Sequence, residues 1–294
     1  MTDAAIESRI DLDHVLRQAK QRLGAAGLRV AKFIDENRQI VLASSAAALG
    51  ARIGTSDATV LRTVQTLGFT SLADLKSAIL KSGAVSTPAD DMRRTLVDLK
   101  KVTGEALDGI MQAHSEGLHV LRSRKCHAQI AAGVRVLEGA ERIAVFGIGP
   151  SSALATYVSM LLARSGRRSR TISATGSMLA DQLLDLGAGD GLLLLAYGRL
   201  YREVKAVFAE AKALRLPTVL VTEADDTPLA KLADVSVAIP RGRPGQMALH
   251  GATLVGLEAM VLSLAVAKPN AALASLENLN RLRRATEAQS KSTR

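Results

Sequence analysis

The sequence has very little cysteine and few aromatic side chains. Its 294 residues include one cysteine, Cys126, and no tryptophan, and aromatic residues make up 2% of the chain. A single cysteine excludes an internal disulfide and a zinc site built from a cysteine cluster. It is also consistent with a reducing compartment. With so few aromatic rings, the core has to be built from Ala, Leu, Val and Ile.

The chain also lacks a long uninterrupted apolar run. Residues 1–10 carry Asp3 and Glu7 and no apolar stretch of the kind that a secretory signal requires. The longest apolar stretch near the C-terminus, residues 252–267, is short for a membrane span and contains Glu258, so it predicts a buried helix. We therefore expect a soluble, cytoplasmic protein without a membrane partner. Hydrophobic side chains make up 48% of the residues, which excludes extensive disorder, and the length favours two domains.

No segment holds a concentrated excess of one charge. The net charge of +10 is spread as +3 over residues 1–84, +1 over 85–140 and +6 over 141–294. A basic balance is compatible with nucleic-acid binding but indicates it only weakly.

Two kinds of periodicity divide the chain. Residues 11–81 show helical spacing punctuated by glycines, which predicts an all-α domain over 1–81. Residues 82–91 have the composition of a linker and helical spacing then returns, so 82–139 are expected to be a linker and connecting helices. From residue 140 to 294, apolar runs alternate with helices, which predicts a parallel sheet flanked by helices. The expected strands are 142–147, 170–172, 192–196, 217–222 and 235–239, and the expected helices include 151–165, 201–214 and 251–267.

The most informative stretch is residues 44–69. A short helix, 45–52, is followed by a glycine turn at Gly54, and a second helix begins after Ser56, a favourable N-cap residue. This is the spacing of a helix-turn-helix unit, whose second helix enters the major groove of DNA. An ordinary helical hairpin with a solvated polar face has the same spacing. Val60, Val64 and Leu67 are expected to face inward, and the residues expected to contact DNA are Ser45, Ser56, Asp57, Thr59, Arg62, Thr63 and Thr66.

Residues 23–80 resemble the N-terminal domain of RpiR-type transcriptional regulators. The family has a small-residue helix, a Gly-x-Ser-x-x-Thr-Val-x-Arg turn, Leu-Gly-Phe, and a closing helix with Leu-Lys. This chain supplies, in that order, Gly54, Ser56, Thr59, Val60, Arg62, Leu67, Gly68, Phe69, Leu75 and Lys76. The resemblance implies that Ser56, Thr59 and Arg62 lie on the DNA-facing side. The chain departs from the family at Thr63 and Val64, which replace an aromatic and a small residue.

A second motif lies where the first predicted strand ends. Gly147 and Gly149 permit a tight turn, and the following N–H groups of Ser151, Ser152 and Ala153 are expected to be free at a helix N-terminus. Such a site stabilises a phosphate or carboxylate, and parallel sheets bind ligands at this edge. The loop is neither a dinucleotide fingerprint nor a P-loop. A tight turn without a ligand has the same pattern.

Residues 140–267 resemble the sugar isomerase (SIS) domain that follows the DNA-binding domain in RpiR-type regulators. The first loop matches, but the family's second loop, Ser-x-Ser-Gly-x-Thr, is replaced by residues 196–203, which bring in tyrosines and arginines. Guanidinium groups bind phosphate or carboxylate, although surface ion pairs are an equally simple role for them. The expected effector-binding residues are Gly147, Gly149, Ser151, Ser152, Tyr197, Arg199, Tyr201, Arg202 and His250.

These resemblances imply a transcriptional regulator that binds double-stranded DNA and a small anionic metabolite, either a sugar phosphate or a related acid. We expect a homo-oligomer, a dimer or a tetramer, that is not an enzyme and uses no cofactor. No metal site is expected, because His114 and His119 lie off one helical face and Cys126 and His127 are adjacent. The alternatives are a sugar-phosphate isomerase, with Glu258 or His250 as its base, or a module that only assembles. Residues of these types in such positions more often have structural roles.

Overall fold

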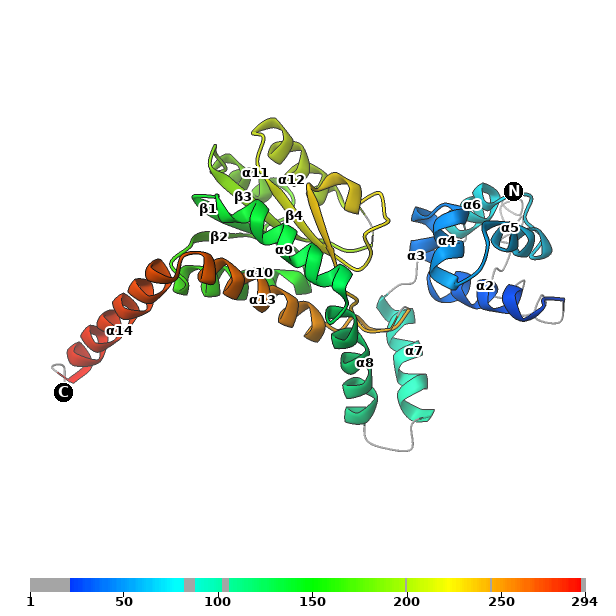
Figure 1. Cartoon of the computed structure of the whole chain (residues 1–294), viewed down its shortest axis with the longest axis horizontal. Coiled ribbons are helices and arrows are strands. Elements are labelled where there is room, and N and C mark those ends of the chain that lie inside the picture. Colours follow the sequence, from blue (N-terminus) through cyan, green and yellow to red (C-terminus); the bar gives the residue numbers. More distant parts are fainter. Residues whose placement is uncertain (1–21, 82–87, 102–105, 199, 244, 292–294) are drawn as a thin grey trace, which may run out of the picture. The chain divides into compact units, whose positions relative to one another are not determined.

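The computed structural model describes residues 22–81, 88–101, 106–198, 200–243 and 245–291. These form two compact units (Figure 1). The first comprises Met1–Met111 together with the separate segment Gly242–Ala248, and the second comprises Gln112–Arg241 and Leu249–Arg294.

The first unit contains a small all-α domain. Its helices are α2 (Ala25–Glu36), α3 (Arg38–Ala43), α4 (Ala46–Ile53), α5 (Asp57–Thr66) and α6 (Leu72–Lys81). Val60 and Val64 are completely buried and Leu67 nearly so, which confirms the predicted inward face of α5. They pack with apolar side chains from all five helices, including Ile34, Val41, Leu49 and Ile79. Residues 11–21 of the predicted helical stretch lie outside the described residues.

The turn between α4 and α5 follows from its capping and glycine residues. The Ser45 hydroxyl accepts a hydrogen bond from the Ala48 N–H, and the Ser56 hydroxyl accepts one from the Thr59 N–H. Between them α4 ends at Gly54, whose φ of 71° lies in the left-handed region that glycine adopts without strain. At position 50 any side chain would clash with the turn, because a Cβ there would lie 2.8 Å from the Thr55 carbonyl oxygen. The predicted cap and turn are therefore confirmed.

Two further helices follow, α7 (Pro88–Lys101) and α8 (Ala106–Leu121). The expectation of a linker over residues 82–91 is wrong at its end, because residues 88–91 form the first turn of α7. Pro88 has no backbone N–H, but at the start of α7 such a group would have no partner within the helix. Asp90 and Asp91 complement the positive end of the helix dipole. Residues 82–87 lie outside the described part of the chain.

The second unit is a five-stranded parallel sheet. Its order is β2 (Arg168–Ile172), β1 (Arg142–Gly147), β3 (Asp190–Leu195), β4 (Thr218–Thr222) and β5 (Val235–Ala238). All five predicted strands are present, with ends that differ from the prediction by at most two residues. Phe146 pairs with Ile172 on one side and with Leu194 on the other, so three strands run to the same carboxyl edge in register.

Helices cover both faces of this sheet (Figure 1). The helices of the unit after α8 are α9 (Arg124–Glu138), α10 (Pro150–Arg164), α11 (Ser177–Leu184), α12 (Arg202–Ala213), α13 (Gly251–Ala267) and α14 (Pro269–Lys291), with a short 3₁₀ helix, Ala230–Leu232. On one face Val145, Leu193 and Val219 pack with α9, α10 and α13. On the other, Phe146 and Leu194 pack with α11 and α12. Burial on both faces is why these strands are continuous apolar runs in the sequence.

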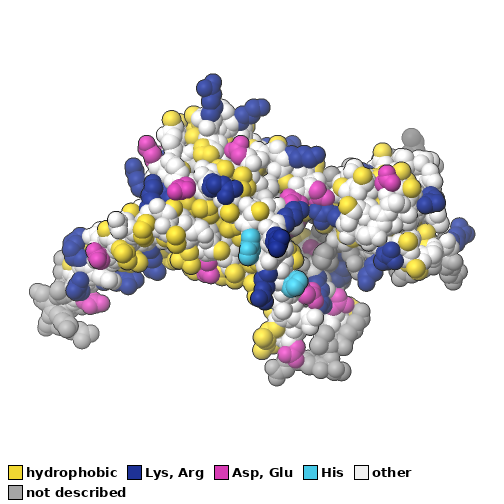
Figure 2. All heavy atoms as spheres, viewed as in Figure 1, with side chains coloured by type: hydrophobic (Ala, Val, Ile, Leu, Met, Phe, Trp, Pro, Cys, Tyr) yellow, Lys and Arg dark blue, Asp and Glu magenta, His cyan; other side chains and the backbone are white. Residues whose placement is uncertain are grey.

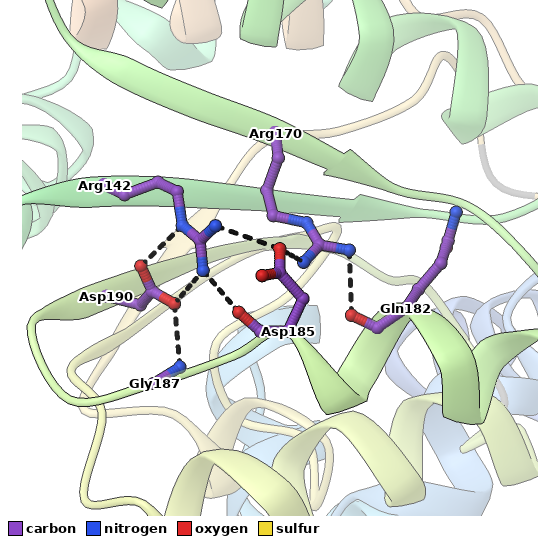
Figure 3. Close-up of polar contacts among 6 residues, drawn as sticks. All are labelled: Arg142, Arg170, Gln182, Asp185, Gly187 and Asp190. Atoms are coloured by element: carbon purple, nitrogen blue, oxygen red, sulfur yellow. Dashed lines mark hydrogen bonds and ion pairs between the residues drawn. The ribbon is translucent and has the colours of Figure 1, made fainter.

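The amino edge of the sheet is held by an ion-pair network (Figure 3). Arg142, at the start of β1, donates from Nε and Nη2 to the two carboxylate oxygens of Asp190, at 2.8 and 2.7 Å. Its Nη1 lies 3.0 Å from the carboxylate of Asp185, which also pairs with Arg170 of β2. Asp190 is 5% exposed and accepts the Gly187 N–H as well. The network joins the first residues of β1 and β3 to the third residue of β2.

The predicted buried helix over 251–267 is α13, with the predicted bounds. No single helix of the described residues is long and apolar enough to cross a membrane. Only α13 and α14 taken together pass that test, and they are bent by 105° at the break between them.

Candidate functional site

Helix α5 presents a polar face at its start. Ser56, Asp57, Arg62 and Thr66 are exposed and Thr59 is half-buried. The Asp57 carboxylate accepts the Ala58 N–H at 2.7 Å. The hydroxyls of Ser56 and Thr59 lie 2.9 Å apart. Arg62 donates from Nε to the Ala58 carbonyl oxygen at 3.3 Å, which holds its side chain along the helix toward the N-terminus. The face therefore offers hydroxyls and a guanidinium group at one end of α5. Ser45 is exposed as the cap of α4.

Thr63 does not belong to this face. It was expected to point outward with its neighbours, but it is 3% exposed, and its hydroxyl donates to the Thr59 carbonyl oxygen at 2.8 Å. A Cβ on Gly27 of α2 would lie 3.4 Å from the Thr63 Oγ1. The expectation was wrong because residue 63 lies three after Val60 and one before Val64. That position places it within the buried stripe.

The lysine of the Leu-Lys motif has a structural role. Lys76 of α6 donates from Nζ to the Ser44 carbonyl oxygen, at 2.8 Å, and burial lowers its pKa. Because Ser44 immediately precedes the cap of α4, this bond ties α6 to the start of the helix-turn-helix. The two residues are 32 positions apart, so the sequence pattern did not predict this contact.

At the carboxyl edge of the sheet, the loops after β1 and β3 leave side by side, because Gly147 pairs with Leu195. Only glycine fits at position 147, because the start of α10 passes close to it and a Cβ there would lie 2.5 Å from the Ser151 carbonyl oxygen. Gly149, with a φ of 57°, precedes α10, which begins one residue earlier than predicted. The expectation that the Ser152 N–H is free was wrong. Both this N–H and the Ser152 hydroxyl donate to the Gly149 carbonyl oxygen, at 3.0 and 2.7 Å. Ser151 is buried.

The loop after β3 leads into α12. Tyr201 is exposed at the N-cap position, and the helix begins at Arg202. The Arg202 side chain is 84% exposed and lies 3.1 Å from the buried Glu203. The pKa of Glu203 is lowered by its own backbone N–H and then by Arg202. Arg202 therefore makes the surface ion pair that was the alternative role for it. Arg199 lies outside the described residues.

A cluster at the same edge includes residues that the sequence analysis missed. The Arg241 guanidinium lies 3.9 Å above the ring centroid of Tyr197, and its Nη2 lies 2.7 Å from the Glu223 carboxylate. The His250 ring meets the Tyr197 ring edge-on, with centroids 5.8 Å apart. Glu223 and Arg241 follow β4 and β5, and their position at strand ends is the signal that could have identified them. We call these four residues, together with Thr253 of α13, whose side chain lies close to Tyr197, the Tyr197 cluster.

The Tyr197 cluster contains buried polar atoms and is incompletely hydrogen-bonded. Burial raises the pKa of Tyr197 to about 12, and burial together with the charge of Arg241 lowers the pKa of His250 to about 4. Both side chains are therefore neutral near pH 7. Within the described part of the chain, no hydrogen bond of normal geometry reaches Tyr197 Oη, Arg241 Nε, His250 Nδ1 or Thr253 Oγ1. Buried polar atoms nearly always have partners, so these four atoms are available to form hydrogen bonds with a polar ligand or with water.

The described residues thus form two groups along one edge, the Ser151–Ser152 loop and the Tyr197 cluster, with no hydrogen bond between them. Glu258 belongs to neither group. Its carboxylate accepts the Tyr157 O–H at 2.7 Å, which raises the pKa of Tyr157 and gives Glu258 a structural partner. Among the described residues, no group of three His, Cys, Asp or Glu side chains could hold a metal ion.

Comparison with known families agrees with both units. Residues 10–86 match the helix-turn-helix domain of the rpiR family, and residues 136–267 match the SIS domain. The chain belongs to the RpiR family of helix-turn-helix transcriptional regulators. Like other members, it joins this DNA-binding domain to a SIS domain.

Three relatives illustrate the similarity of this regulator across its length. It is 24% identical over 273 residues to the uncharacterized HTH-type transcriptional regulator TTE0211 of Caldanaerobacter subterraneus subsp. tengcongensis, covering 91% of this chain and 95% of that one. It shares the fold of the Vibrio vulnificus NanR protein complexed with ManNAc-6P, with a TM-score of 0.56 and 23% identity over 92% of this chain and 97% of that one. The sugar isomerase domain of the RpiR transcription factor from Sphaerobacter thermophilus gives a TM-score of 0.51 and 24% identity, over 58% of this chain and 93% of that one.

Proposed function

We propose that α5 recognises operator DNA and that the SIS domain binds a small anionic metabolite which changes operator affinity. The observation that supports this best is the exposed polar face of α5, held in a capped helix-turn-helix. Base edges in the major groove are read by arginine and by short polar side chains, and this face offers both. Arg62 lies one turn into α5, where it can reach a guanine edge or a phosphate.

The DNA-binding proposal is tested by replacing Arg62. On a duplex selected from genomic fragments with the full-length protein, Arg62→Ala is expected to weaken binding by about 1–3 kcal/mol if Arg62 reads a base. The loss on unrelated DNA should be smaller. Arg29→Ala, an exposed arginine on α2, is the matched control. Wild-type affinity in Arg62→Ala would contradict the assignment of α5 as the recognition helix.

The effector proposal rests on the carboxyl edge of the sheet. The N-terminus of α10 favours an anion, and the Tyr197 cluster offers polar atoms that lack partners. NanR of Vibrio vulnificus is seen with ManNAc-6P, so sugar phosphates are the first class to test. Because the loop after β3 lacks the family's hydroxyls, organic acids are tested alongside them.

A thermal-shift screen with ManNAc-6P, other hexose phosphates and organic acids tests this site. A compound that stabilises the wild type should lose its effect in Ser151→Ala/Tyr197→Phe, because that variant removes two of the proposed polar contacts. Ser263→Ala, which removes an exposed hydroxyl on α13, is the control. A shift that survives in the double variant would place the site elsewhere. The absence of any shift would favour a SIS domain that only assembles.

We also propose that α13 pairs with the same helix of a second copy. Its outer face carries Val255, Ala259, Leu262 and Val266, spaced four, three and four residues apart as in a helical packing seam. Leu262 is 64% and Val266 77% exposed. Figure 2 shows hydrophobic side chains gathered over α13 and the start of α14. An uncharged seam is complementary to itself across a twofold axis, and a dimer presents two recognition helices to paired half-sites.

Light scattering at micromolar concentration tests this pairing. The wild type should have at least the mass of a dimer, and Leu262→Glu should have that of a smaller species, because a charge would be buried in the seam. Leu184→Glu, at a leucine of α11 that is even more exposed, should keep the wild-type mass. A monomeric wild type, or an unchanged mass in Leu262→Glu, would contradict the proposal.

We propose no enzymatic role, although the SIS fold is shared with isomerases. Conversion of an aldose to a ketose needs a base aimed at a carbon next to a carbonyl group. Glu258 is hydrogen-bonded to Tyr157, and His250 is half-buried and packs edge-on against Tyr197. A purified protein that interconverted aldose and ketose phosphates would overturn this view.

A further inference from the structure

The segment Gly242–Ala248 connects β5 to α13 in the sequence but belongs to the same compact unit as α7. We call it the β5–α13 segment. Three hydrogen bonds attach it to α7: Gln246 Nε2 donates to Asp98 Oδ2 at 2.6 Å, the Met247 N–H donates to Thr95 Oγ1 at 2.8 Å, and Arg94 Nη1 donates to the Gly245 carbonyl oxygen at 3.5 Å. Both a side chain and the backbone of the segment therefore hold α7.

The two ends of the β5–α13 segment lead directly into the Tyr197 cluster. Arg241 precedes it and His250 follows Leu249, so the segment is flanked by two members of the cluster. The Leu249 N–H donates to the Arg241 carbonyl oxygen at 3.0 Å, which closes the segment into a loop. Gly242 and Gly245 have φ values of 81° and 72°, a conformation that glycine adopts without strain. A displacement of Arg241 or His250 must therefore be taken up within a short closed loop.

Helix α7 is the first helix after the helix-turn-helix domain in the chain. We propose that the β5–α13 segment transmits the effector response, so that a ligand at the Tyr197 cluster changes the hydrogen bonds to α7 and thereby operator binding. This inference rests on the proposed function. A ligand shifts a conformation only where its contacts differ between the two states. Arg241 supplies such a difference, because an anion that pairs with its guanidinium competes with Glu223.

Coupling between two sites is reciprocal, so operator DNA can serve as the probe in place of a metabolite. We would measure amide hydrogen exchange of the full-length protein with and without a selected duplex. In the wild type, DNA should slow exchange in α5 and also change it over residues 245–254, which include the Met247 N–H. In Thr95→Val/Gln246→Ala the protection of α5 should remain. The change over 245–254 should be lost, because the variant removes two of the hydrogen bonds that attach the segment to α7.

Two controls separate this effect from general damage. Thr95→Ser keeps the hydroxyl that accepts the Met247 N–H, and Gln112→Ala removes an exposed glutamine of α8. Both should behave like the wild type. The inference is overturned if DNA protects α5 without changing 245–254, or if that change survives in the double variant. Absence of protection in α5 itself is a different pattern, and it would overturn the proposed DNA binding and this inference with it.

Discussion

Loss of the Arg142 side chain should destabilise the SIS domain far more than loss of an exposed arginine. Asp190 is 5% exposed and receives both of its strongest contacts from Arg142 (Figure 3). Removing one partner of a buried ion pair leaves an uncompensated charge, which costs about 3–5 kcal/mol. For Arg142→Leu we expect a loss of unfolding free energy at the lower end of this range, because the Arg142 side chain is 23% exposed and the positive charge of Arg170 lies nearby. For a domain of this size, the melting temperature should fall by about 6–12 °C.

The loss should depend on pH in a defined direction. Burial alone would raise the pKa of Asp190, but the hydrogen bond from Arg142 lowers it below its usual value. In the wild type, this contribution is present above the unfolded pKa and is lost as pH falls through the folded pKa. Without Arg142, burial dominates and the pKa of Asp190 rises, so the variant takes up a proton on acidification. The difference in unfolding free energy should therefore be largest near pH 7 and shrink toward about pH 4.5.

Urea unfolding of the full-length protein, followed by circular dichroism at both pH values, measures this difference. Arg93→Ala is the matched control, because Arg93 and Asp90 form an exposed pair, with side chains 75% and 41% exposed. Such pairs contribute about 0–1 kcal/mol. Arg142→Leu/Asp190→Asn should recover most of the loss, since the amide can still accept the Gly187 N–H. A loss no larger than that of Arg93→Ala, or one that is independent of pH, would refute the reasoning.

Three further predictions concern single residues. Gly50→Ala should abolish operator binding, because its Cβ would meet the backbone of Thr55 and displace α5. In Gly54→Ala the new Cβ meets no other atom, so the only cost is about 1–2 kcal/mol of backbone strain from the left-handed conformation. Equal effects in a DNA-binding assay would argue against the close contact. Ser56→Ala should lower the unfolding free energy by about 0.5–2 kcal/mol through loss of the cap, and Ser56→Asp should preserve it in urea unfolding. The pKa of His250, followed by NMR, should lie at about 4, and the unfolding free energy should fall as pH drops from about 6.5, because only the unfolded chain then binds this proton. Titration of His250 near its ordinary value would show that the Tyr197 cluster is open to water.

Local features of the sequence were sufficient to predict both domains. The apolar runs within 142–147 and at 192–196 predicted strands buried on both faces, since no polar residue interrupts 143–147 or 192–196. Ser56 and Gly54 predicted the turn of the helix-turn-helix, because a hydroxyl cap and a left-handed glycine act within a few residues of themselves. The glycine turn of the first loop, at Gly147 and Gly149, followed from the same local chemistry.

Contacts between distant residues were decided only by the tertiary structure. Thr63 faces the core because α2 packs against that side of α5, which the polarity of threonine conceals. Arg241 and Glu223 meet Tyr197 because β4 ends beside β3 and β5 ends beside β4, and strand order cannot be read from the amino-acid pattern. The attachment of Gln246 to Asp98 joins residues 148 positions apart. Capping, turns and burial depend on a few neighbouring residues, whereas a binding cluster depends on which elements the fold places side by side.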